Sequence, residues 1–192
     1  MAIKHLHTPL TGDDLAGLKA GDSVRISGVI YTARDAAHKK LAALIAEGKP
    51  LPLDLKGQVI YYVGPCPAKP GRVIGSAGPT TSGRMDRYTP LMLEQGMKAC
   101  IGKGLRSAAV KEALQKHRAV YLAAVGGAGA LLSKRVLESE VIAYPELGAE
   151  AIRRLRVEDF PATVINDIYG NDLYEQGVRA YAREEKQSPE ID

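Results

Sequence analysis

The segment from residue 75 to residue 84, GSAGPTTSGR, has the residue types that most favour ligand chemistry. Its hydroxyl side chains lie among glycines, which let the backbone approach a ligand closely and let successive N–H groups converge on an anion. Arg84 ends the segment with a planar guanidinium that matches a carboxylate in bidentate fashion. The Gly-Lys-Ser/Thr ending of a nucleotide-binding P-loop is missing. An ordinary loop rarely gathers so many hydroxyls beside an arginine, so the segment favours an anion site.

Asp86 follows Arg84 by two residues. Its carboxylate could orient the Arg84 guanidinium, or it could cap the next helix, because Asp is a favoured capping residue. The sequence leaves both roles open for Asp86.

A second candidate site lies where a predicted strand gives way to a predicted helix. Arg34 and His38 are four residues apart, so they share one face once the helix has begun. Loops at strand ends commonly present ligand groups. A solvated helix surface fits the same two residues equally well, and spacing alone leaves the choice open.

Two glycine-rich turns are weaker candidates. Lys103 lies between Gly102 and Gly104, where an open backbone lets the lysine reach a ligand as a point charge. Residues 126–130, GGAGA, follow a predicted buried strand and could present backbone N–H groups to an anion. The dinucleotide fingerprint is absent there, and close packing of backbone on backbone is the favoured interpretation.

Composition excludes several classes of protein. The chain has 192 residues and a net charge of +4, and its aromatic content of 5% includes no Trp. A nucleic-acid-binding protein more often has a basic stripe with interleaved aromatic residues. The mild basic excess suits a small anionic ligand or simply a solvated basic surface.

Cys66 and Cys100 are the only cysteines, and their spacing fits neither a disulfide framework nor a zinc site. Two thiols also cannot supply the several thiolates that hold an iron–sulfur cluster. No apolar run resembles a signal peptide or reaches the ~18 residues of a membrane span. These observations predict a cytoplasmic protein that binds no metal by itself and needs no membrane or nucleic acid.

Hydrophobic periodicity and turn residues predict an interleaved order of strands and helices. The expected strands are residues 23–32, 58–63, 72–74, 119–125, 141–144, 153–157 and 162–168. The expected helices are residues 13–18, 34–47, 90–95, 107–117, 131–134 and 173–184, with Ser107 as an N-cap. No repeat or break in composition divides the chain, so residues 1–192 are expected to form one domain with a frayed tail at 186–192.

Several of these motifs occur together in one known family. YYVGP at 61–65, IGSAGPTTSGRMD at 74–86 and IGKG at 101–104 resemble the β subunit, or C-terminal region, of class I iron–sulfur fumarases and L-tartrate dehydratases. The Arg34–His38 motif, the turn at 126–130, VEDFPA at 157–162 and residues 167–172 resemble the same family in the same order. The resemblance extends from about residue 10 to about residue 182.

The resemblance implies a fold and an activity. It implies an α/β fold, a swivelling β/β/α domain with a mixed sheet core and flanking helices. It implies reversible addition of water across the double bond of a C4 dicarboxylate, with a 4Fe–4S cluster acting as a Lewis acid. The cluster cysteines of the family lie in the α subunit or N-terminal region, so a partner chain is expected to carry the cluster. This chain alone is then expected to be inactive, in an assembly such as a dimer of heterodimers.

The resemblance also implies roles for individual residues. Arg34, Arg84 and Lys103 match the groups that hold the substrate's charges, and Thr81 and His38 are expected to bind substrate beside them. Thr80 matches the proposed catalytic base. A threonine hydroxyl is a poor base near neutral pH unless a neighbour activates it, so Thr80 could instead only position the substrate.

Three functions remain open at the level of sequence. Fumarate hydration to L-malate is the first, and L-tartrate dehydration is the second, because the same cations would hold either substrate. The third is a non-enzymatic swivelling module that binds a small anion or a partner protein. The set of Thr80, Arg84, Arg34 and Lys103 argues against the third, since a non-catalytic module has no chemical need for all four.

Overall fold

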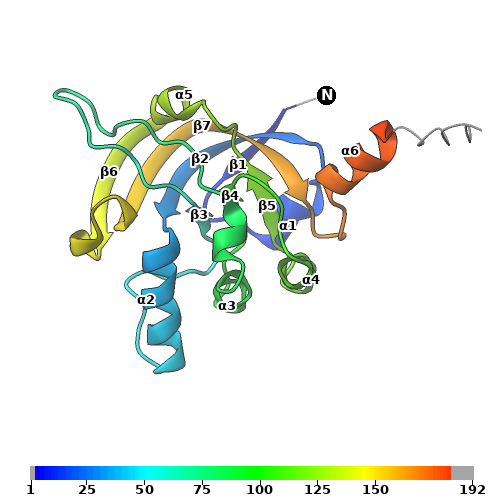
Figure 1. The fold of residues 1–192 in the computed structure, drawn as a ribbon, viewed down its shortest axis with the longest axis horizontal. Helices are drawn as coiled ribbons and strands as arrows, with labels where there is room; N and C mark the ends of the chain where they lie inside the picture. Colours follow the sequence, from blue (N-terminus) through cyan, green and yellow to red (C-terminus); the bar gives the residue numbers. More distant parts are fainter. Residues whose placement is uncertain (1–2, 183–192) are drawn as a thin grey trace, which may run out of the picture.

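The computed structural model describes residues 3–182, which form a seven-stranded mixed sheet with helices packed against it (Figure 1). The strand order is β1-β2-β3-β4-β5-β7-β6, and β2 also pairs with β7. The strands are β1 (Lys4–His7), β2 (Ser23–Thr32), β3 (Val59–Tyr61), β4 (Ala99–Gly102), β5 (Val120–Ala123), β6 (Val136–Ala143) and β7 (Ile152–Asn166). Since β7 pairs with both β2 and β5, the strands β2, β3, β4, β5 and β7 close into a ring.

Strands β1 to β5 are parallel to one another, and β7 runs antiparallel to β2, β5 and β6. The long strand β2 pairs with β1 along its first half and with β3 at its end. At Gly28 the φ angle is 108°, and a Cβ there would lie 2.5 Å from the Thr8 hydroxyl oxygen. Only glycine fits this bend, which lies between the part of β2 paired with β1 and the part paired with β3.

Helices cover the sheet on more than one side. They are α1 (Gly12–Ala16), α2 (Asp35–Ala46), α3 (Thr89–Glu94), α4 (Ala108–Lys116), α5 (Gly129–Ser133) and α6 (Leu173–Tyr181), with 3₁₀ turns η1 (Ser82–Met85) and η2 (Pro145–Glu150). Figure 1 shows α2, α3 and α4 below the strands and α5 at the top of the view. Within residues 3–182 no helix is both long and apolar enough to cross a membrane.

Apolar side chains form two cores, one inside the ring of strands and one between strands and helices. In β3 and the residue after it, Val59 and Tyr61 belong to the first core, whereas Ile60 and Tyr62 belong to the second. Both faces of β3 are therefore buried, which is why this strand reads as a continuous apolar run rather than an alternating one.

The mixed sheet with flanking helices confirms the predicted α/β fold class, and most predicted elements are present. The strand expected at 72–74 is wrong, because this stretch forms a turn in which the Arg72 N–H donates to the Lys69 carbonyl at 3.0 Å. Strands β1 and β4 were not predicted; β1 (KHLH) has only one apolar residue, and β4 (ACIG) combines small residues with a single isoleucine. The tail at 186–192 and the end of the helix predicted at 173–184 lie outside the described residues.

The two strands expected at 153–157 and 162–168 are one continuous strand, β7. Between Phe160 and Val157 the register with β2 shifts by one residue, and Asp159 has a φ of 49°. This is a β-bulge at which Asp tolerates the left-handed conformation. The bulge and the neighbouring Pro161 interrupt the alternating pattern, so the sequence reads as two strands.

Candidate active site

The predicted site residues lie where the carboxyl ends of the parallel strands meet. Arg34 follows the end of β2, and Lys103 follows the end of β4. The ligand segment at 75–84 belongs to the long connection after β3, and the turn at 126–130 follows β5. Parallel strands place their carboxyl ends on one edge, which is where α/β sheets commonly bind ligands.

Backbone hydrogen bonds bring the two threonines and Lys103 together. The Thr80 N–H donates to the Tyr62 carbonyl at 2.7 Å, and the Lys103 N–H donates to the Thr80 carbonyl at 3.2 Å. The Ser82 N–H donates to the Lys103 carbonyl at 2.8 Å, and Thr81 forms a parallel bridge with Lys103. Residues 80–82 therefore extend the sheet between the ends of β3 and β4. Thr80 is half-buried, whereas Thr81 and Lys103 are exposed.

The two arginines lie on either side of one carboxylate. Arg84 Nε donates to Asp35 Oδ1 at 2.9 Å, and Arg34 Nε lies 3.9 Å from Asp35 Oδ2. Arg34 Nη2 also lies 3.5 Å from Glu150 Oε1. The Arg84 side chain is 51% exposed and that of Arg34 only 21%, so Arg84 offers more of its guanidinium to a ligand.

The arginine pair and the threonine–lysine group are neighbours through the chain segment that follows β3. Arg34 packs against the backbone of Gly64, where a Cβ would lie 2.7 Å from Arg34 Nη1. Gly64 comes two residues after Tyr62, whose carbonyl holds Thr80. The turn η1 then leads directly from residues 80–82 to Arg84. One edge of the sheet thus carries all three predicted cations and both threonines.

His38 lies in the interior beneath Arg34. Its Nδ1 is 2.9 Å from the Arg34 carbonyl, and its ring packs edge-on to Tyr62 and stacks with Tyr88. The side chain has no exposed surface, and burial lowers the pKa of His38 to about 4. The imidazole is therefore neutral at pH 7 and donates from Nδ1 to the carbonyl, so it fixes the backbone of Arg34 rather than reaching the open edge.

Asp86 pairs with a residue that the sequence did not single out. Its Oδ1 accepts from Arg106 Nε at 2.7 Å, and its Oδ2 accepts from the Ser107 N–H at 2.6 Å. The expectation that Asp86 orients Arg84 is wrong, because Asp35 has that role. The expectation that Asp86 caps the next helix is also wrong, because α3 begins without a side-chain cap hydrogen bond and the N-cap residue of α4 is Ser107.

The sequence did not predict Asp35 and Glu150, which pair with the predicted arginines, or Arg106, which pairs with Asp86. Asp35 directly follows Arg34, so sequence proximity could have indicated it. Glu150 and Arg106 lie far along the chain from their partners, and no local pattern marks them.

The turn at 126–130 packs closely against the ligand segment, as predicted. A Cβ on Gly129 would lie 2.8 Å from the Gly78 nitrogen, and the Ala77 N–H donates to the Gly129 carbonyl at 3.0 Å. A Cβ on Gly126 would lie 3.6 Å from Lys103 Cδ. The turn therefore supports both the ligand segment and the lysine.

Within residues 3–182, His, Cys, Asp and Glu side chains form no group of three or more that could hold a metal ion. Both cysteines are free thiols; Cys66 is exposed and Cys100 is buried. The described residues of this chain do not fit the direct binding of an iron–sulfur cluster.

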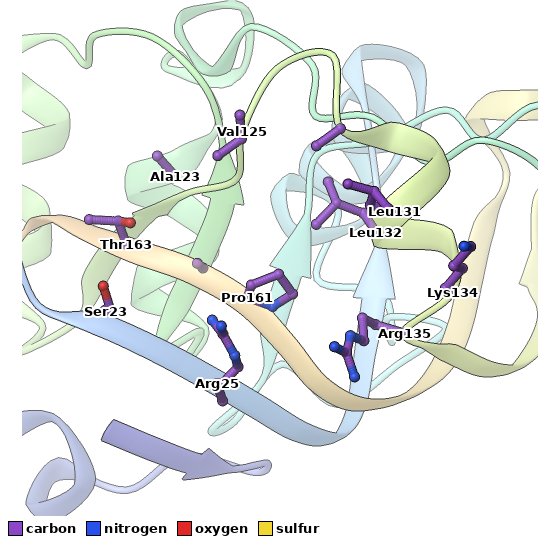
Figure 2. A pocket seen from close by; sticks show the side chains of 12 residues that line it. Ser23, Arg25, Ala123, Val125, Leu131, Leu132, Lys134, Arg135, Pro161 and Thr163 are labelled. Atoms are coloured by element: carbon purple, nitrogen blue, oxygen red, sulfur yellow. The ribbon is translucent and has the colours of Figure 1, made fainter. Parts of the chain in front are cut away.

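A cavity of about 570 Å³ lies away from these residues, between α5 and the strands β2, β5 and β7. Figure 2 shows Leu131 and Leu132 of α5 on one side of it and Arg25 and Pro161 on the other. None of the predicted site residues lines this cavity. The candidate site is instead an open surface at the strand ends.

Comparisons with known proteins agree with this arrangement of fold and site. The family model described as "Fumarase C-terminus" matches residues 2–177. "Fumarate hydratase class I, anaerobic" of Escherichia coli is 45% identical over 153 residues, 79% of this chain and 28% of that protein. "Fumarate hydratase 2" of Leishmania major is 41% identical over 162 residues, 83% of this chain and 28% of that protein. "L(+)-tartrate dehydratase subunit beta" of Escherichia coli is 34% identical over 194 residues, 98% of this chain and 94% of that protein.

The chain belongs to the fumarase C-terminus family, whose matching relatives carry the names of hydro-lyases. It spans little more than a quarter of the length of the fumarate hydratases, but nearly the full length of the tartrate dehydratase β subunit.

Proposed function

We propose that this chain is the β subunit of an iron–sulfur hydro-lyase that hydrates fumarate reversibly to L-malate. The observation that carries the proposal is the Arg34–Asp35–Arg84 group, which lies at the same sheet edge as Thr80 and Lys103. Membership of the family supports the reaction class.

The charges at the edge suit a small dicarboxylate. Asp35 and Glu150 partly balance Arg34 and Arg84, and Lys103 adds a positive charge. Asp35 accepts from Nε of Arg84 and so holds one edge of the guanidinium, which leaves its far end, between Nη1 and Nη2, for a ligand. Those two nitrogens can hold one substrate carboxylate in bidentate fashion while Lys103 attracts the other as a point charge.

Thr80 and Thr81 complete the substrate side of the site. The Thr80 backbone is held by Tyr62 and Lys103, so its hydroxyl is fixed without using its own hydrogen-bonding capacity. We assign proton transfer to Thr80 Oγ1 and substrate binding to Thr81. Asp86 is occupied by Arg106 and Ser107, so the group that activates Thr80 comes from the partner chain.

The partner chain is proposed to carry the 4Fe–4S cluster and to cover the open edge. Thr81, Lys103 and half of the Arg84 side chain are exposed, which is a poor setting for chemistry that must control water. A cluster-bearing α subunit placed over this edge would supply the Lewis acid and exclude bulk water. We expect this cytoplasmic complex to be a dimer of heterodimers and the isolated chain to be inactive.

L-Tartrate dehydration is the second candidate. It is favoured by the match along 94% of a tartrate dehydratase β subunit, whereas the fumarate hydratases are more similar in sequence. The proposed cations would hold either diacid, so substrate comparison decides between the two.

The test is anaerobic co-expression with a cluster-bearing α subunit, followed by turnover measurements on fumarate, L-malate and L-tartrate. We expect the highest kcat/KM for the fumarate–malate pair. Preferred turnover of L-tartrate would establish the second candidate. Absence of turnover on every C4 diacid, with diacid binding by the isolated chain, would replace both with a non-enzymatic anion-binding module.

A further inference from the structure

Arg106 is a buried cation outside the predicted site. Its side chain has 0% exposure, and its guanidinium carbon lies 5.5 Å from the ring centre of Tyr62 and 4.9 Å from that of Tyr121. Burying a charge between two aromatic rings is costly unless hydrogen bonds compensate for the lost water.

All three nitrogens of the Arg106 guanidinium have partners. Nε donates to Asp86 Oδ1 at 2.7 Å, Nη1 donates to Cys100 Sγ at 3.1 Å, and Nη2 donates to Thr89 Oγ1 at 2.7 Å. A lysine ammonium has the same charge but lacks this planar, three-directional set of donors. The position is therefore specific for arginine.

Tyr62 connects this cluster to the catalytic edge. Its hydroxyl lies 3.1 Å from Thr89 Oγ1, the acceptor of Arg106 Nη2. Its carbonyl accepts the Thr80 N–H at 2.7 Å. Arg106 is thus linked through Thr89 to the hydroxyl of Tyr62, and Thr80 is bonded to the backbone carbonyl of the same tyrosine.

Tyr121 makes a second connection. Its hydroxyl donates to the Gly104 carbonyl at 2.9 Å and lies 2.9 Å from Ser82 Oγ, which must then donate to it. Ser82 in turn donates its N–H to the Lys103 carbonyl at 2.8 Å. Tyr121, the second aromatic ring beside Arg106, therefore contacts both segments that pair at this edge, through Ser82 in one and Gly104 in the other.

We infer that Arg106 is a positioning residue that fixes Thr80 and Lys103 through Tyr62 and Tyr121. This inference rests on the proposed function for its catalytic consequence, but its structural part does not. The ion pairs of Asp35 with Arg34 and Arg84 include none of Arg106, Tyr62 and Tyr121, so loss of Arg106 is expected to misplace Thr80 and Lys103 while these ion pairs remain.

The kinetic test uses Arg106→Lys and Arg106→Gln in the reconstituted complex, normalised to cluster content. We expect kcat to fall ~10- to 100-fold, as for a misaligned catalytic group, and KM to rise by a smaller factor, because Lys103 is the one predicted cation that the network holds. Lys98→Met is the matched control, because Lys98 is a half-buried cation at the opposite end of β4 that donates to the His117 carbonyl. An unchanged kcat in both Arg106 variants would overturn the inference.

Amide hydrogen exchange of the chain tests the same inference without activity. We expect the Thr80, Ser82 and Lys103 amides to exchange at least ~10-fold faster in the Arg106 variants, with β2 and β7 amides unchanged. Tyr121→Phe, which keeps the ring but loses the hydroxyl, is expected to loosen Ser82 and Lys103 and decides the question if the Arg106 variants do not fold.

If the Thr80, Ser82 and Lys103 amides of the folded variants exchange at the wild-type rate, the positioning role of Arg106 is refuted. Faster exchange across the whole chain would make Arg106 a stability residue only. If the wild-type complex hydrates no C4 diacid, the proposed function fails, while the exchange data still decide what Arg106 holds in place.

Discussion

Arg84 and Arg87 are exposed arginines three residues apart whose surroundings differ. Arg84 is oriented by Asp35, whereas the Arg87 guanidinium lies over the ring of Tyr88 at 4.6 Å. In the reconstituted complex, Arg84→Ala is expected to lower kcat/KM ~10²-fold or more, because it removes a charged positioning group. Arg87→Ala serves as the control for loss of one surface charge. If Arg84→Ala and Arg87→Ala both change kcat/KM only slightly and to the same extent, Arg84 does not bind the substrate carboxylate.

His38 gives the fold a pH dependence that can be measured in the isolated chain. Burial holds its folded pKa at about 4, while an unfolded histidine titrates near ~6.5. Between these values the unfolded chain binds the extra proton, so stability falls as the pH is lowered. The expected loss between pH 7 and pH 5 is about 2 kcal/mol of unfolding free energy.

Urea unfolding at the two pH values checks this expectation. His38→Gln should lose less stability than the wild-type chain on going to pH 5, whereas substitution of the exposed His7 by Gln should leave the wild-type dependence intact. An identical pH dependence in the His38 variant would mean that the buried imidazole is not the group responsible.

Among the elements, α5 is held against the ligand segment by a contact that only glycine permits. A Cβ at Gly129 would lie 2.5 Å from Ser76 Oγ and 2.8 Å from the Gly78 nitrogen, and the second atom is backbone that cannot rotate away. Gly129→Ala is therefore expected to cost about 1–3 kcal/mol in unfolding free energy.

Gly177 is a control position at which alanine is expected to increase the unfolding free energy rather than lower it. It lies within α6, and a Cβ there would meet nothing within 4 Å. Gly177→Ala should stabilise the chain by about 0.5–1 kcal/mol, since alanine favours the helix. Two substitutions with the same sign in denaturant unfolding would contradict the packing assigned to Gly129.

The sequence predicts elements well where one local signal dominates. The Ser107 N-cap of α4 and strand β2 are examples, because capping chemistry and alternation are encoded within a few residues. Prediction from the sequence fails at β4, whose four small or apolar residues show no alternation. It also fails at the Asp159 bulge, which interrupts the alternation of β7 so that one strand is predicted as two.

The candidate site divides in the same way. The ligand segment, Arg84 and Lys103 stand out by composition and by family resemblance. The pairing of Asp35 with Arg84 and of Asp86 with Arg106 depends on tertiary contacts across 49 and 20 residues, respectively. Partners at such separations follow from the topology of the sheet and not from any local spacing.

At the scale of the whole molecule, the described residues form a closed ring of strands with an open, cationic edge. The chain matches nearly all of a tartrate dehydratase β subunit but only 28% of a class I fumarate hydratase. Both observations agree with the proposal that this chain is a subunit whose site a second chain completes.

The most direct test is a titration of this chain into a fixed amount of the cluster-bearing partner under anaerobic conditions, with fumarate hydration followed at each ratio. The account predicts no hydration by either protein alone and a rate that rises to a plateau at one chain per partner. Full activity of one protein by itself, or no activity at any ratio, would contradict it.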